Sequence, residues 1–161
     1  MTPDRSSRVN IREIHSNELQ SLLGLYAHLH ERDDPPPSDA VAGAVWSEVF
    51  ANPRIRYFGG FASGSLVASC TLAVIPNLTR ACRPYGVIEN VVTHAAHRRQ
   101  GWGKAVLTHA LEHAWRQNCY KVMLLTGRKD EATLRFYEQA GFDQHDKQAF
   151  VARPPERTQG R

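Results

Sequence analysis

Two glycines one residue apart, Gly101 and Gly103, stand between a β-rich segment and a helix-like segment, with basic residues on both sides. Glycine has no Cβ, so main-chain N–H groups at these positions can approach an anion closely. The first turn of the helix that follows offers unpaired N–H donors and about half a positive charge. Arg98, Arg99 and Lys104 add fixed cations. The segment therefore predicts a site for an anion such as a pyrophosphate.

Two common phosphate loops do not match this order of residues. The nucleoside-triphosphate loop has the pattern Gly-x-x-x-x-Gly-Lys-Ser/Thr, but Ala105 follows Gly103-Lys104 and no glycine stands five residues before Gly103. The dinucleotide fingerprint requires a third glycine and an acidic residue about twenty positions later. This chain has Val106 in place of that glycine and no acidic residue within 122–126. Both nucleotide loops are therefore excluded.

The pattern Arg98-x-x-Gly101-x-Gly103 resembles the coenzyme A loop of the GNAT superfamily of acyl-CoA N-acyltransferases. In that family, Arg/Gln-x-x-Gly-x-Gly/Ala lies between a strand and a long helix. The resemblance implies a single α/β domain over residues 1–161, with a mixed, splayed β-sheet flanked by helices. We expect its core at about 8–152 and a flexible tail at 153–161. It also implies acetyl-CoA as cosubstrate and no metal.

A second family signature, Asn-x-x-Ala-x-x-Phe-Tyr-x-x-x-Gly-Phe, is matched downstream by Phe136-Tyr137 and by the Gly-Phe pair at 141–142. Asp130 and Thr133 stand where Asn and Ala are usual, and Asp can still cap a helix N-terminus. The specific resemblance covers residues 85 to 143. The stretches 88–92 and 119–121 also look like the glucosamine-phosphate acetyltransferase branch.

Direct acyl transfer from a thioester to an amine needs a base, because an amine with a pKa near 10.4 is only about one part in a thousand free base at neutral pH. The resemblance places that base at Glu89; the alternative is a solvated residue, or one paired with an arginine. It places the oxyanion donor at the main chain of Val91 or Val92. It gives Tyr137 the role of protonating the leaving thiolate; the alternative is a core tyrosine.

The resemblance also assigns a set of residues to the cofactor. Backbone groups from Arg99 to Lys104 hold the pyrophosphate, and Trp102 either covers the pantetheine or packs on the sheet. The full set is Val91, Val92, Thr93, Arg98, Arg99, Gln100, Gly101, Trp102, Gly103, Lys104 and Asp130.

For the acceptor we expect a primary amine of a small molecule; a protein amine, or a non-catalytic acyl-CoA-binding module, is the alternative. The family builds this side from the first two helices, their loop and the turn before the strand at 87–93. Acidic residues there would attract a cationic amine, whereas Arg83 would bind a phosphate or carboxylate. The candidates are Tyr26, His28, His30, Asp33, Asp34, Trp46 and Arg83.

The histidines do not form a zinc motif. His109 and His113 share a helix face, but the stretch His-Ala-Leu-Glu-His places its glutamate wrongly for His-Glu-x-x-His. We therefore expect these two to be surface residues. His94 and His97 lie near the glycine loop, where His94 is a candidate for assisting proton transfer.

Apolar patterns predict the elements that must position these residues. The predicted order is β-α-α-β-β-β-α-β-α-β. Helices are expected after Ser16 and from Asp39, at 102–118 and after Asp130, and the strands lie at 9–14, 56–62, 66–74, 87–93, 121–126 and around Phe150.

The composition limits the protein's class. A chain of 161 residues fits one compact domain, and 42% hydrophobic residues with 22% charged residues indicate a globular protein. The sequence has no apolar run of membrane-spanning length and no signal-peptide pattern, and its three cysteines lack metal-ligand spacing. We therefore expect a cytoplasmic protein with no membrane partner. The net charge of +4 is dispersed, so no nucleic-acid partner is predicted. The family resemblance suggests a homodimer.

Overall fold

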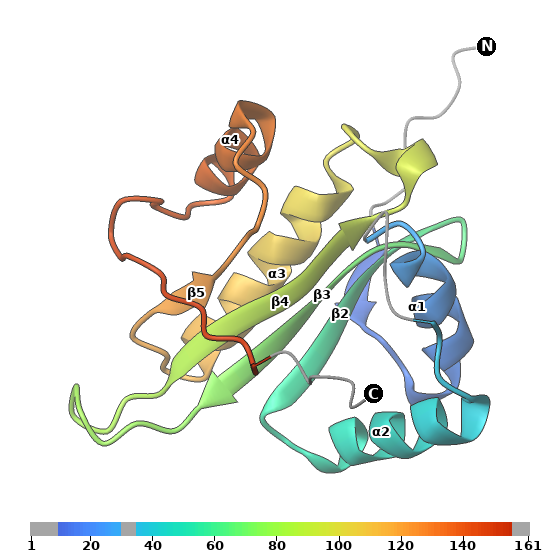
Figure 1. The fold of residues 1–161 in the computed structure, drawn as a ribbon, viewed down its shortest axis with the longest axis horizontal. Coiled ribbons are helices and arrows are strands. Elements are labelled where there is room, and N and C mark those ends of the chain that lie inside the picture. The colour runs from blue at the N-terminus through green and yellow to red at the C-terminus, as the bar shows by residue number, and fades with distance from the viewer. Residues whose placement is uncertain (1–9, 30–34, 156–161) are drawn as a thin grey trace, which may run out of the picture. The chain divides into compact units, whose positions relative to one another are not determined.

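The computed structural model describes residues 10–29 and 35–155. They fall into two compact units, the first ending at Thr126 and the second beginning at Gly127. The elements of the first unit are β1 (Asn10–Glu13), η1 (Ser16–Glu18), α1 (Leu19–Tyr26), α2 (Asp39–Ala51), β2 (Ile55–Ala62), β3 (Ser65–Ile75), β4 (Tyr85–Thr93), η2 (Ala95–His97), α3 (Trp102–Arg116) and β5 (Val122–Leu124) (Figure 1). The second unit contains α4 (Glu131–Gln139).

The strands of the first unit form one mixed sheet in the order β1-β2-β3-β4-β5. Neighbours from β1 to β4 are antiparallel, whereas β4 and β5 are parallel. The parallel pairing ends where Ile88 meets Leu124, although β4 continues to Thr93. The two strands therefore separate after Ile88, and the predicted α/β class with a mixed, splayed sheet flanked by helices is confirmed.

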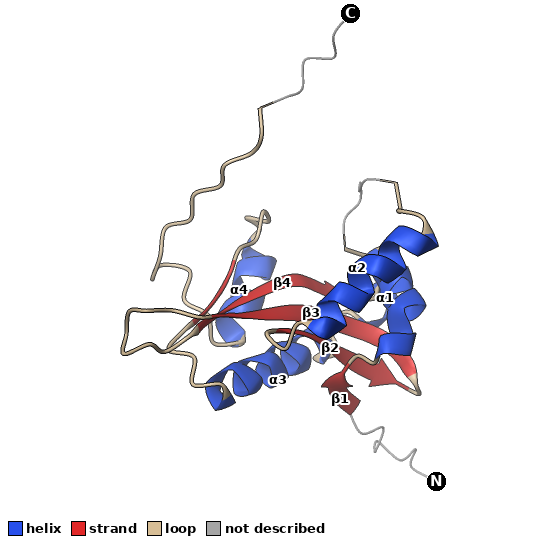
Figure 2. Ribbon diagram, turned by 90° about the horizontal axis from the view of Figure 1, so that it is seen from below, coloured by secondary structure: helices blue, strands red, loops and turns tan. Residues whose placement is uncertain are grey.

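Helices cover both faces of this sheet (Figure 2). On one face, Ile14, Leu22, Trp46 and Phe61 form a buried cluster that fastens α1 and α2 to β2. Trp46 is held further by a 2.8 Å hydrogen bond from its Nε1 to the carbonyl oxygen of Ser16. The burial of these large apolar side chains is what positions α1 beside β3 and β4.

The other face is covered by α3, whose buried residues recur three or four positions apart, as an amphipathic helix requires. They are Trp102, Gly103, Val106, Leu107, Ala110 and Ala114. A Cβ on Gly60 of β2 would lie 3.0 Å from Cε3 of Trp102. Glycine at this position therefore allows the first turn of α3 to approach the sheet closely.

In the second unit, α4 begins at the cap residue Asp130 and is followed by a turn at Gly141, where φ is +97°. The predicted strand around Phe150 is wrong, because residues 140–155 contain no strand and Phe150 is 90% exposed. A strand needs a neighbour to satisfy its main-chain hydrogen bonds, and an isolated apolar pair does not supply one.

Candidate active site

The pairing of β3 with β4 contains a bulge shortly before the end of β4. Thr71 pairs with Glu89, whereas Ser69 pairs with Val92, so one residue of β3 faces two of β4. Asn90 lies in this bulge with φ of +52°, a left-handed conformation that asparagine adopts more readily than most residues. A bulge leaves its extra residue outside the ladder and redirects main-chain groups. Since pairing with β5 has already ended, the main chain after Glu89 faces no strand of the described residues on that side.

Glu89, the predicted base, is exposed at the start of the bulge. Its pairing with Thr71 across the ladder places both side chains on the sheet face that α1 and α2 cover. Among the described residues, no ion pair joins Glu89 to Arg80 or Arg83. The carboxylate is therefore accessible to a substrate or a water molecule.

Val91 and Val92 pack as expected, since Val92 is 4% exposed and Val91 is half-buried. A binding role at these positions thus belongs to the main chain. Thr93 is half-buried, and its carbonyl oxygen accepts a 3.2 Å hydrogen bond from Nε of Arg98. The strand is thereby tied to the loop that follows it.

The loop between β4 and α3 is fixed by its own side chains. Nδ1 of His94 accepts a 3.1 Å hydrogen bond from the N–H of Ala96 and caps η2. Nη2 of Arg98 donates to the carbonyl oxygen of His28 at 3.1 Å. Arg98 thus joins β4, the loop and the end of α1. Its guanidinium makes contacts within the protein, which the sequence alone did not predict.

The end of this loop has the geometry of an anion-binding turn. Arg99 and Gly101 have φ of +59° and +87°, and Gly101 is the N-cap of α3. The first helical N–H groups, those of Trp102, Gly103 and Lys104, have no intrahelical acceptor and point toward the loop. A phosphate bound there would receive N–H donors and the positive end of the helix dipole.

Three further members of the predicted cofactor set lie in this turn. The side chain of Trp102 is 9% exposed and packs against Gly60, so the sheet-packing alternative holds for its indole. Lys104 is exposed beside the turn. Gln100 is exposed, and its Nε2 donates to the carbonyl oxygen of Ala96 at 3.1 Å.

In the second unit, Asp130 caps α4 as expected. Its Oδ1 accepts a 3.0 Å hydrogen bond from the N–H of Thr133, and its Oδ2 accepts one from the Thr133 hydroxyl. These bonds lower the pKa of Asp130, chiefly through the main-chain donor. The ring of Tyr137 packs edge-on against Phe136 and Phe142, at centroid distances of 5.0 and 6.3 Å. The predicted roles of Asp130 and Tyr137 toward the cofactor stay predictions.

The acceptor candidates have different surroundings. Trp46 is a core residue, 7% exposed. Tyr26 is half-buried and its hydroxyl has no hydrogen-bond partner among the described residues. The ring of His28 lies 4.1 Å from that of His94, and burial is the first cause that lowers the pKa of His94, followed by His28. Three of the candidates, His30, Asp33 and Asp34, lie outside the described residues.

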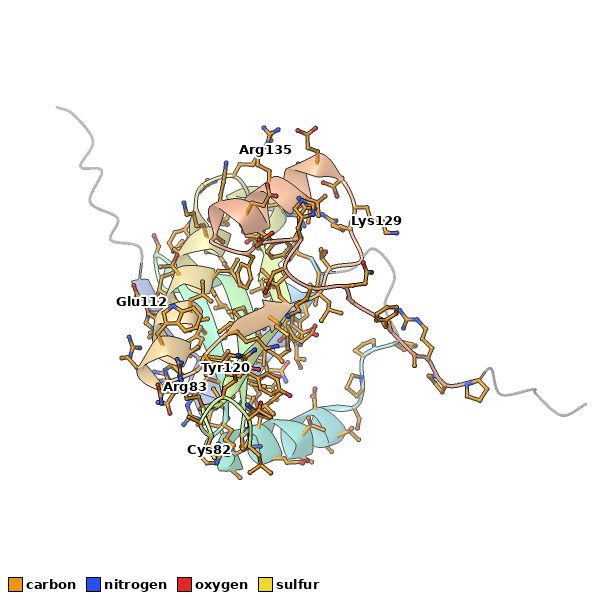
Figure 3. All side chains as sticks on the ribbon, turned by 90° about the vertical axis from the view of Figure 1, so that its left-hand side faces the viewer. Cys82, Arg83, Glu112, Tyr120, Lys129 and Arg135 are labelled. Carbon is orange, nitrogen blue, oxygen red and sulfur yellow. The ribbon has the colours of Figure 1, made fainter. Side chains whose placement is uncertain are left out.

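Arg83 lies two residues before β4, where its guanidinium donates to the carbonyl oxygens of Asn118 and Cys119 at 3.4 and 3.3 Å. It therefore joins the β3–β4 loop to the segment before β5. Tyr120 lies close to Arg83 (Figure 3). Nζ of Lys121 is 5.4 Å from the Tyr120 ring centroid.

Arg80 also lies over the Tyr120 ring, at 5.7 Å. A basic and aromatic cluster, consisting of Arg80, Arg83, Tyr120 and Lys121, thus forms where two loops meet. Sequence reasoning found only Arg83, because the other members are brought together by the pairing of β4 with β5.

The two histidines of α3 are not the surface residues that the sequence predicts. The rings of His109 and His113 lie 5.1 and 5.3 Å from that of Phe58 on β2. Burial lowers the pKa of His113. These residues help pack α3 on the sheet. Within the described parts of the chain, no group of three or more potential ligands is placed to hold a metal ion.

No helix in the described segments combines the length and apolar character needed to cross a membrane. Residues 17–142 match the model of the Acetyltransferase (GNAT) family. The glucosamine 6-phosphate N-acetyltransferase of Trypanosoma brucei brucei is 33% identical over 142 residues, covering 87% of this chain and 92% of that protein. Glucosamine 6-phosphate N-acetyltransferase 1 of Oryza sativa subsp. japonica is 35% identical, covering 76% of this chain and 73% of that protein.

Comparison with a solved structure supports the same family. A structure from Agrobacterium tumefaciens, assigned as an acetyltransferase, has a TM-score of 0.85 and 46% identity, and covers 91% of this chain and 100% of that one. The chain therefore belongs to the Acetyltransferase (GNAT) family and is an enzyme of the acyltransferase class.

Proposed function

We propose that this enzyme transfers the acetyl group of acetyl-CoA directly to a primary amine of a small molecule. One observation carries the proposal: Glu89, the bulge of β4 and the left-handed turn at Gly101 follow one another on a single strand–loop–helix unit. A base, main-chain donors and a phosphate-binding turn are the groups that this reaction requires. The cofactor would lie along the separated end of β4, with its pyrophosphate against residues 99–104.

In the proposed reaction Glu89 accepts a proton from the ammonium group, directly or through water, and the free amine attacks the thioester carbonyl carbon. A carbon–nitrogen bond forms, and the negative charge on the carbonyl oxygen is stabilised by the N–H of Val91 or Val92. The nitrogen releases its second proton to water, and the intermediate collapses with cleavage of the carbon–sulfur bond. Tyr137 donates a proton to the departing thiolate. No covalent enzyme intermediate is formed.

For the acceptor, an amino sugar that carries an anionic group is favoured over a protein amine. Two relatives are named for glucosamine 6-phosphate. In this chain, Arg80, Arg83 and Lys121 cluster around Tyr120, and no carboxylate of the described residues forms an ion pair with them. A cationic cluster without acidic partners is suited to an anionic acceptor.

Binding of acetyl-CoA is tested by thermal denaturation with and without the cofactor, using Gly101→Asp and Gly64→Asp as matched variants. Gly64 lies in the β2–β3 turn with φ of +84°, close to the +87° of Gly101, and a Cβ at either glycine meets nothing within 4 Å. Both variants should therefore lose similar stability. A ligand at a hundred times its Kd adds about 2.7 kcal/mol. We expect the shift in the natural chain and in Gly64→Asp, and its loss in Gly101→Asp.

Turnover is tested by following free thiol release with glucosamine 6-phosphate, glucosamine and a lysine peptide. The proposal expects the phosphorylated amino sugar to be the best of the three. Preference for the peptide would favour a protein acetyltransferase. Binding of acetyl-CoA without turnover of any amine would favour a non-catalytic acyl-CoA-binding module. Absence of any thermal shift would refute the cofactor assignment itself.

A further inference from the structure

The guanidinium of Arg98 binds main-chain oxygens of two segments that are far apart in the sequence. Its Nε donates to the carbonyl oxygen of Thr93 at 3.2 Å, and its Nη2 donates to that of His28 at 3.1 Å. Thr93 is the last residue of β4, whereas His28 stands two residues after the end of α1. Arg98 therefore joins the C-terminal end of α1 to the strand that carries Glu89.

This contact suits the end of a helix. The last carbonyl oxygens of a helix have no intrahelical donor, and a cation beside them is favoured by the helix dipole. Beyond α1 the chain continues in a turn, where the N–H groups of His28 and Leu29 donate to carbonyl oxygens of the last helical residues. The carbonyl oxygen of His28 then accepts from Arg98, and the ring of His28 lies 4.1 Å from that of His94. Two contacts from the loop after β4 thus fix the position of this helix end.

The loop between β4 and α3 has other hydrogen bonds besides those of the Arg98 guanidinium. Its start is bound to β3 by a 2.8 Å hydrogen bond from the N–H of His94 to the carbonyl oxygen of Val67. Nδ1 of His94 accepts from the N–H of Ala96, and Nε2 of Gln100 donates to the carbonyl oxygen of Ala96. Loss of the guanidinium should therefore release the end of α1 more than the turn that follows the loop.

The end of α1 borders the approach to the proposed base. The side chain of Glu89 points to the sheet face that α1 and α2 cover, so an amine that gives its proton to Glu89 must approach on this face. There α1 contacts both β3 and β4 (Figure 1). The contacts of Arg98 and His94 bring the C-terminal end of α1 to the end of β4. The position of this helix end therefore limits where the amine can lie.

We propose that Arg98 is a positioning residue for the amine acceptor and not a ligand of the pyrophosphate. It holds the end of α1 in the place where that end forms one side of the acceptor site. The inference rests on the proposed function, because it takes Glu89 as the group that deprotonates the amine. The pyrophosphate is left to the main-chain groups of residues 99–104 and to the dipole of α3. This role differs from the one that the family resemblance gives to Arg98.

The test is Arg98→Lys, with Arg56→Lys as the matched control. Lysine keeps the positive charge but replaces the planar fork by a single ammonium group, which does not reproduce the two contacts. Arg56, near the start of β2, also donates to main-chain carbonyl oxygens, those of Asn52 and Ile55. A lysine there still has a charge to pair with Glu13, as Arg56 does. The control therefore loses the same kind of hydrogen bond away from the loop.

The acceptor and the cofactor should respond differently. With acetyl-CoA saturating and glucosamine 6-phosphate as the amine, Arg98→Lys should raise the KM for the amine about three- to tenfold, the effect of about one hydrogen bond. Both kcat and the Kd for acetyl-CoA, measured by titration calorimetry, should change less than about twofold, because binding of the amine alone is weakened. Arg56→Lys should leave all three constants as in the natural chain.

A higher Kd for acetyl-CoA with an unchanged KM for the amine would make Arg98 a phosphate ligand and overturn the inference. Equal rises in both constants, or a change in neither, would overturn it as well. If the natural chain acetylates no amine tested, the proposed function fails, and amide hydrogen exchange then decides whether Arg98 holds the end of α1. The amides of His28 and Leu29 should exchange faster in Arg98→Lys than in Arg56→Lys. Equal exchange in the two variants would refute the inference by itself.

Discussion

Replacing Gly60 by alanine tests whether the packing of α3 on β2 sets the position of the pyrophosphate turn. The added Cβ would lie 3.0 Å from Cε3 of Trp102, 3.1 Å from Cδ1 of Ile11 and 3.3 Å from Cγ2 of Val106. Carbon atoms pack best at about 3.5–4.0 Å. The first turn of α3 must therefore move outward by a few tenths of an ångström, or these side chains must leave their preferred rotamers.

Such overpacking costs about 1–3 kcal/mol. In a protein of this size each kcal/mol lowers the melting temperature by about 2–4 °C, so Gly60→Ala should melt roughly 2–12 °C lower. Since Trp102 follows Gly101 directly, displacement of its indole also moves the N–H groups of the turn. We expect the Kd for acetyl-CoA, measured by titration calorimetry, to rise about three- to tenfold, or roughly 0.7–1.4 kcal/mol.

Gly86→Ala is the matched control. A Cβ on Gly86 would lie 3.0 Å from Cγ2 of Val122 and 3.1 Å from Cδ1 of Leu72, so the crowding is similar but no atom of the turn is involved. This variant should lose comparable stability and keep its affinity for acetyl-CoA. Equal loss of affinity in the two variants, or unchanged affinity in Gly60→Ala at a lowered melting temperature, would refute the reasoning.

The other predictions concern four single residues. Hydrogen bonds from Arg12 lower the pKa of Glu18 to about 2, below the usual value of 4.5. The carboxylate therefore stabilises the fold above about pH 4.5 and loses this effect as the pH falls toward 2. Allowing for solvent exposure, Glu18→Gln should lower the free energy of unfolding by about 1 kcal/mol at pH 7. Urea titrations should show this difference closing near pH 2, and a constant difference would contradict the ion-pair explanation. Glu89→Gln should lower kcat by about 10²–10⁴-fold. Tyr137→Phe should lose less, because a thiolate of pKa near 8.5 can leave unprotonated; full turnover by both variants across pH would remove both assignments. Asp130→Ala should speed amide exchange in the first turn of α4, whereas Asp130→Asn, which keeps a capping oxygen, should not; equal exchange in the two would show that the cap is dispensable.

The sequence by itself determined the loop and the elements on each side of it. The spacing of Gly101 and Gly103, the basic residues beside them and the apolar periodicity of 102–116 are local properties, and the structure places α3 and the left-handed turn accordingly. Asp130 as a helix cap was predictable for the same reason, since a cap depends on residues three positions apart. Strands that alternate clearly or are strongly apolar, such as β2 and β3, were also found within a few residues.

The tertiary structure determined which contacts each side chain near the loop makes. Arg98 looks like a phosphate ligand in the sequence, yet its guanidinium joins the carbonyl oxygens of Thr93 and His28, residues that only the fold brings together. Trp102 could have faced the cofactor. Its indole instead packs on the sheet, because Gly60 has no Cβ to obstruct it. Phe150 was expected in a strand and has no partner strand to pair with among the described residues.

The bulge and the unpaired hydroxyl of Tyr26 were likewise not predictable from the sequence. A bulge arises from the register between two strands, and the stretch 88–92 contains no glycine that would indicate a left-handed residue at Asn90. Tyr26 belongs to the apolar stripe of a helix, so periodicity predicts a core residue and says nothing of its hydroxyl. The local spacing of residues determines which backbone groups can bind an anion. Contacts between segments distant in the sequence determine which side chains are used in packing and which are left available for catalysis.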